Sequence, residues 1–160
     1  MQTLGRLLNR PEDRIVEKTT ALLADKKSLE KELKQLKADS LSGNIDKLIA
    51  EATDHNGVKR IMHRVDDVEM AALKELADKI RSKTKSTIGL LAGVSNEKLV
   101  FVVFVSDDLL ANYKAGDIIR EVARAAGGGG GGRPHLATAG GKDVTRLPQA
   151  IKRFEELVTR

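Results

Sequence analysis

Six consecutive glycines, residues 127–132, precede Arg133 in the segment GGGGGGRPHLATAGG, and a second glycine pair follows at 140–141. Glycine has no Cβ and adopts positive φ easily, so its backbone N–H groups can approach a phosphate closely. A neighbouring guanidinium can hydrogen-bond two phosphate oxygens at once. The segment therefore indicates a shaped loop that contacts phosphates. The alternatives are a loop that only permits tight packing and a flexible linker, which would not need the second pair.

The spacing differs from those of two common phosphate-binding loops. No Gly-Lys-Ser/Thr follows the glycines, as it does in a P-loop, and a predicted helix rather than a strand precedes them. A dinucleotide fingerprint requires a strand at that place. The sequence therefore predicts no nucleotide cofactor.

Catalytic and metal-binding combinations are weak elsewhere in the chain. There are no cysteines, and none of the three histidines lies four residues from another, so neither a thiolate nor a histidine zinc site is expected. The acidic pairs Asp66–Asp67 and Asp107–Asp108 are typical of turns and caps more than of Mg²⁺ sites. No nucleophile lies in a pattern with a base. We therefore predict no catalytic residue and no metal.

The charge is unevenly distributed along the chain. The formal net charge is +5, and residues 110–160, which hold the glycines, carry a net +4 of it. This excess favours an anionic partner. Stacking on single-stranded bases is not expected, because there are only four aromatic side chains. These are Phe101, Phe104, Tyr113 and Phe154. Binding should therefore depend on shape and backbone contacts.

Arg120 and Arg124 stand one turn apart on a helix predicted over residues 115–127. We expect them to extend a positive surface beside Arg133 and Lys142. The alternative is that they belong to an ordinary solvated helix face.

A long helix is predicted over residues 11–40, with Pro11 suited to its first turn. Its apolar positions recur every seven residues, with one further leucine on the adjoining row, so they form a weak coiled-coil seam. The seam consists of Ile15, Leu22, Leu29, Leu36 and, on the adjoining row, Leu33. It either joins two chains in a dimer or packs on residues 45–52 of the same chain.

The remaining pattern predicts a small two-layer α/β (α+β) domain over residues 54–160, behind a helical stalk over residues 1–53. The strands are expected at 58–65, 86–94, 98–106 and 135–140, and the helices at 68–83, 115–127 and 144–160. No apolar run is long enough for a membrane span, and the first residues do not resemble a signal peptide. A cytoplasmic location is the expectation.

The glycine segment resembles the signature of the C-terminal domain of alanyl-tRNA synthetases, a member of the DHH-associated domain family. That pattern is a glycine run, Arg-Pro, two variable residues and Ala-x-Ala-Gly-Gly. It is matched here by Gly129 to Gly132, Arg133, Pro134, Ala137, Ala139, Gly140 and Gly141. The preceding order of elements agrees, so the resemblance extends over nearly the whole chain from residue 11 onward.

The resemblance implies a non-catalytic module that docks the outer corner, or elbow, of an alanine-specific tRNA. It implies that the module acts beside the other domains of a parent alanine–tRNA ligase, and that the stalk can form a homodimer. The residues expected at the RNA are Gly129, Gly130, Gly131, Gly132 and Arg133, supported by Arg120, Arg124 and Lys142.

Two other functions remain open. Related phosphoesterases carry a similar C-terminal domain, and Asp54-His55-Asn56 resembles part of their Asp-His-His metal motif. The second histidine is missing, and a turn explains these residues better. The alternatives are therefore the substrate-binding domain of a DHH-type phosphoesterase and a plain dimerisation module.

Overall fold

The structure is a computed structural model that describes residues 15–159. The chain divides into two compact units between Lys37 and Ala38. This division lies earlier than the expected boundary at residue 53. The reason is that helix α3 (Ile45–Ala50) buries Ile45 and Leu48 in the core of the second unit.

Helix α2 (Ile15–Gly43) is the predicted long helix, and its expected start at residue 11 lies outside the described residues. Ile15 is buried, whereas the four leucines of the heptad rows are 44–67% exposed. The dimer seam and the packing on residues 45–52 both stay predictions. No described helix is long and apolar enough to cross a membrane.

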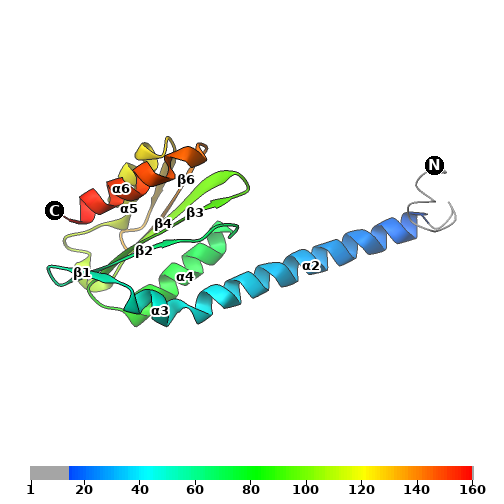
Figure 1. The fold of residues 1–160 in the computed structure, drawn as a ribbon, viewed down its shortest axis with the longest axis horizontal. Helices are drawn as coiled ribbons and strands as arrows, with labels where there is room; N and C mark the ends of the chain where they lie inside the picture. Colours follow the sequence, from blue (N-terminus) through cyan, green and yellow to red (C-terminus); the bar gives the residue numbers. More distant parts are fainter. Residues whose placement is uncertain (1–14, 160) are drawn as a thin grey trace. The chain divides into compact units, whose positions relative to one another are not determined.

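A six-stranded sheet in the order β1-β2-β3-β4-β6-β5 forms the centre of the second unit (Figure 1). Only β2 and β3 pair in parallel, and the other neighbours are antiparallel. The strands are β1 (Thr53–His55), β2 (Val58–Arg64), β3 (Thr87–Ser95), β4 (Lys98–Val105), β5 (Gly129–Gly132) and β6 (Leu136–Gly141).

Helices cover both faces of the sheet (Figure 1). α3 and α4 (Met70–Lys83) pack on one face, and α5 (Ala115–Ala125) and α6 (Leu147–Val158) pack on the other. Two short 3-10 helices, η2 (Asp107–Leu109) and η3 (Val144–Arg146), lie in the connections. The prediction of a mixed α/β fold is confirmed. The layers number three rather than two, because β3 and β4 are apolar on both faces and so require cover on both.

The turn interpretation of Asp54-His55-Asn56 is confirmed. Asn56 and Gly57 have φ values of 55° and 79°, as two-residue hairpin turns require, and they connect β1 to β2. The Gly57 N–H donates to Asp54 Oδ1 at 3.0 Å. This aspartate therefore stabilises the hairpin.

The acidic pairs also hold loops. Asp66 Oδ1 accepts a hydrogen bond from the Val94 N–H at 2.9 Å. Asp108 accepts bonds from the Ser86 N–H and hydroxyl, which fix Ser86 at a φ of 50°. Hydrogen bonds from Ser106 and Ser86 lower the pKa of Asp108 to about 2. Both aspartates therefore hold a segment that is distant in the sequence, rather than a turn or cap of their own segment.

The glycine run is not the loop that the sequence predicts. Gly127 turns the chain at a φ of 65°, and Gly129–Gly132 then form β5, the edge strand that pairs antiparallel with β6. Glycine has low strand propensity, so nothing local indicates this strand. It forms because β6 would otherwise leave its backbone groups unpaired on that side.

Candidate nucleic-acid interface

Alternate glycines of β5 are required by packing. A Cβ at Gly130 would lie 2.3 Å from Cβ of Ala139, and one at Gly132 would lie 2.6 Å from Cα of Ala137. Ala137 and Ala139 belong to the core cluster beneath α5 and α6. Gly130 and Gly132 therefore allow β5 to lie close against β6 on the α5 side of the sheet.

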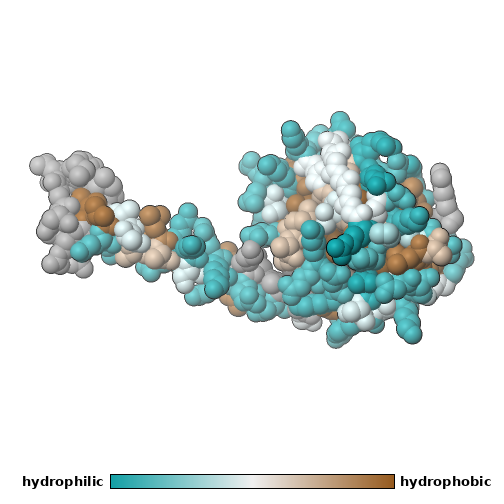
Figure 2. Space-filling view, turned by 180° about the vertical axis from the view of Figure 1, so that it is seen from behind, coloured by the Kyte–Doolittle hydropathy of each residue, from teal (hydrophilic) through white to brown (hydrophobic). Residues whose placement is uncertain are grey.

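The other two glycines of β5 point to open space. A Cβ at Gly129 or Gly131 would meet no atom within 4 Å. Their partners in β6 are Gly140 and Thr138, which therefore share the same face of the sheet. The hairpin thus presents a face almost without side chains, which we call the open face, made of Gly129, Gly131, Thr138 and Gly140. A pale band of near-neutral hydropathy, the colour of glycine and threonine, crosses the second unit in Figure 2 between hydrophilic side chains.

A groove of about 780 Å³ lies where β5 begins and β6 ends. Gly127–Gly129 and Gly140–Gly141 line it, together with Lys98 and Lys142. Lys142 was expected here from its position beside the second glycine pair. Lys98 was missed, because only the pairing of Leu99 with Gly141 brings it to the groove.

Arg133 lies at the opposite end of the hairpin. Its N–H donates to the Leu136 carbonyl at 2.9 Å, and the Pro134 carbonyl accepts from the Ala115 N–H at 2.7 Å, so the connection is well fixed. The Arg133 side chain is exposed. β6 separates it from Lys142 by about 20 Å at roughly 3.3 Å per residue. The sequence placed these two cations in one cluster, whereas the structure places them at the two ends of the open face.

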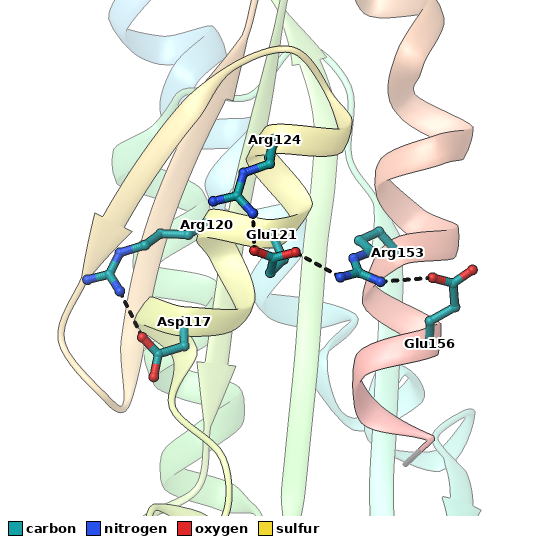
Figure 3. A network of polar contacts seen from close by, with 6 residues as sticks. All are labelled: Asp117, Arg120, Glu121, Arg124, Arg153 and Glu156. Carbon is teal, nitrogen blue, oxygen red and sulfur yellow. Dashed lines mark hydrogen bonds and ion pairs between the residues drawn. The ribbon is translucent and has the colours of Figure 1, made fainter.

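Arg120 and Arg124 lie on α5, which covers the other face of the sheet. Arg120 pairs with Asp117 at 2.8 Å, and Arg124 pairs with Glu121 (Figure 3). The structure therefore does not bring these arginines to the open face, and a carboxylate offsets each charge.

Glu121 also joins α5 to α6. One of its oxygens accepts from Arg153 Nη2 at 2.8 Å, and Arg153 pairs with Glu156 at 3.2 Å (Figure 3). The hydrogen bond from Arg153 lowers the pKa of Glu121. The network thus links α5 to α6.

The sequence profile of the DHHA1 domain matches residues 57–160. The chain belongs to the DHHA1 domain family. The predicted membership of the DHH-associated domain family is therefore confirmed, and the match includes the whole glycine hairpin.

This DHHA1 domain is similar to the C-terminal part of alanine–tRNA ligases. It is 36% identical to the alanine–tRNA ligase of Natranaerobius thermophilus over 159 residues, which are 99% of this chain and 18% of the ligase. The C-Ala domain of Aquifex aeolicus alanyl-tRNA synthetase superposes with a TM-score of 0.65 and 32% identity. That superposition covers 69% of this chain and 99% of the C-Ala domain.

A more distant likeness shows the fold alone. RecJ of Thermus thermophilus, solved in complex with Mn²⁺, superposes with a TM-score of 0.52 and 18% identity. The superposition covers 88% of this chain and 19% of RecJ. The DHHA1 fold is therefore shared with proteins other than synthetases.

Proposed function

We propose that this DHHA1 domain is the tRNA-binding C-terminal module of an alanine–tRNA ligase, and that it docks the elbow of alanine tRNA. The similarity to the C-Ala domain over nearly all of that domain supports the parent enzyme. In this proposal the module has no catalytic centre of its own. It holds tRNA for aminoacylation and editing by the other domains of a cytoplasmic enzyme.

The open face of the β5–β6 hairpin is the observation that carries the RNA-binding part of the proposal. Its surface lacks Cβ atoms at Gly129, Gly131 and Gly140, so a sugar–phosphate backbone can approach closely. Lys142 and Arg133 provide positive charge at its two ends. A surface with this chemistry contacts phosphates and reads little sequence, as suits a folded tRNA corner.

The test compares full-length alanine tRNA with an acceptor-stem minihelix that lacks the elbow. We expect the chain to bind the full tRNA and not the minihelix, with affinity that falls as salt rises, because phosphate contacts release counterions. Arg133→Ala should weaken the binding several-fold and reduce the salt slope by about one. Filter binding or fluorescence anisotropy at two or more salt concentrations measures both quantities.

Equal affinity for the tRNA and the minihelix would contradict docking at the elbow. Binding to neither would contradict RNA binding by this chain. The phosphoesterase alternative gains no support from RecJ, because that likeness is confined to the fold.

The exposed leucines of α2 favour a second function, self-association of the stalk. Leu22, Leu29 and Leu36 recur at heptad spacing and are all exposed in the single chain. A second copy of the same helix would bury this row as a coiled-coil seam. Homodimerisation and tRNA binding are compatible, because they use different units of the chain.

Sedimentation velocity tests this association. We expect a dimer at micromolar concentration and a monomer for Leu29→Lys, because a charge in a short seam removes burial and adds desolvation cost. Lys27→Gln, at an exposed position of the same helix, is the matched control and should leave the dimer intact. A monomeric wild-type chain would exclude the seam as an interface.

A further inference from the structure

Helix α4 borders the open face on one side. Val102 and Phe104 of β4 pair with Thr138 and Leu136 of β6 and pack in the same core cluster as α4. The open face and α4 therefore lie on the same side of the sheet. α4 packs on β3 and β4 and reaches β6, which leaves β5 beyond its edge.

The two flanks of α4 have different surroundings. On one flank, Lys83 pairs with Asp46 of α3 at 3.0 Å. On the other flank, Met70 lines the groove with Gly140. Lys74 is exposed and follows Met70 by one helical turn. Helical periodicity therefore places Lys74 on the flank that faces β6 and the open face.

Four cations thus surround the open face, and none has an ion-pair partner among residues 15–159. They are Lys74, Lys98, Arg133 and Lys142. On the opposite face of the sheet, by contrast, Arg120, Arg124 and Arg153 are each paired with a carboxylate. The arginines of the opposite face are thus offset by carboxylates, whereas the four cations around the open face are not, within the described part of the chain.

We infer that the RNA backbone lies along the open face of the β5–β6 hairpin, beside α4, and that Lys74 and Lys98 contact its phosphates. This inference rests on the proposed tRNA-binding function. Charge complementarity selects RNA as the occupant, because four unpaired cations border the open face, whereas one carboxylate, Glu69, lines the adjoining groove. The cations at the two ends of the face, Arg133 and Lys142, lie about 20 Å apart at roughly 3.3 Å per residue. This distance is several times the spacing of about 3.4 Å between successive charges along one nucleic-acid strand.

The inference assigns different roles to the two faces of the sheet. The α5–α6 face stays free of RNA, with its arginines offset by ion pairs within α5 and between α5 and α6. The α4 face supplies the contacts, and two of its lysines come from elements outside the glycine segment. Lys74 lies on α4 and Lys98 begins β4.

The test is a double variant, Lys74→Gln with Lys98→Gln, in the full chain. We expect its affinity for alanine tRNA at low salt to fall by about tenfold or more, with the log–log salt slope reduced by about 1.4 to 1.8 for two lost phosphate contacts. The matched control is Lys59→Gln with Lys152→Gln. These lysines are also exposed and unpaired, but Lys59 lies on β2 near the other edge of the sheet, and Lys152 lies on α6. The control should stay within twofold of wild type.

Position is tested separately by alkylation of single cysteines, because the natural chain has none. Gly129→Cys places a thiol on the open face, and Arg124→Cys places one on α5. Bound tRNA should slow alkylation at position 129 at least threefold and leave position 124 unchanged. Protection at position 124 alone would overturn the inference.

The outcomes separate the inference from the proposed function. If wild-type chain binds tRNA but the Lys74/Lys98 variant and its control behave alike, the inference is wrong and tRNA binding stands. If the wild-type chain binds no tRNA, both fail. A loss of tRNA affinity in the Lys74/Lys98 variant but not in its control, together with protection of position 129 from alkylation, supports the inference and the proposed function.

Discussion

Alanine at position 89 is expected to destabilise the second unit by about 3 kcal/mol or more, the upper part of the range for overpacked cores. Gly89 of β3 lies directly opposite Phe104 of β4. A Cβ at Gly89 would lie 2.1 Å from Cζ of the Phe104 ring. The ring is fully buried, so it cannot move aside without displacing its neighbours.

Urea denaturation followed by circular dichroism measures this loss. Gly131→Ala is the matched control, because it adds the same methyl group in a strand where no atom lies within 4 Å. We expect the control to change the free energy of unfolding by less than about 1 kcal/mol. A Gly89→Ala chain as stable as wild type would mean that Phe104 has an alternative position in the core.

The second large effect is expected on RNA binding from Gly130→Ala. The new Cβ would lie 2.5 Å from the Thr138 carbonyl oxygen and 2.3 Å from the Ala139 Cβ, so β5 must separate from β6. The open face then loses its shape, and we expect tRNA affinity to fall by at least about tenfold, or roughly 1.4 kcal/mol. The core strands β3 and β4 do not depend on β5, so the unit should stay folded.

One measurement on two variants separates local from global damage. Amide hydrogen exchange should show lost protection in β5 and β6 for Gly130→Ala, with protection kept in β3 and β4. Gly131→Ala should keep β5 protected, because its methyl group points to open space. Retained exchange protection in β5 of the Gly130→Ala chain would refute the packing role of this glycine.

Much of the fold could be predicted because its central elements carry strong periodic patterns. The apolar run of β4 and the Asn56-Gly57 turn each specify their structure locally. β5 could not be predicted in this way. Four glycines have no hydrophobic periodicity, and their strand exists only because β6 offers a partner.

The sequence indicated which glycines belong to the candidate site, but it indicated fewer of the charged residues around them. Arg133 and Lys142 stand next to the glycines in the sequence, whereas Lys98 reaches the groove only through the register of β4 and β6. The ion pairs of Arg120 and Arg124 were indicated by the sequence. Asp117 precedes Arg120 by three residues, and Glu121 precedes Arg124 by three. The additional contact from Arg153 required the packing of α6 on α5.

The glycine edge also bears on aggregation. Sheets commonly guard an outer strand with lysine, proline or a bulge, because its unpaired backbone groups invite another chain to add a strand. β5 carries none of these gatekeepers within Gly129–Gly132. An incoming strand would find no side chains to pair with across the new ladder, and it would have to hold in place the most flexible type of backbone. The absence of side chains that opens this edge to close approach therefore also makes it a poor template for edge-to-edge association.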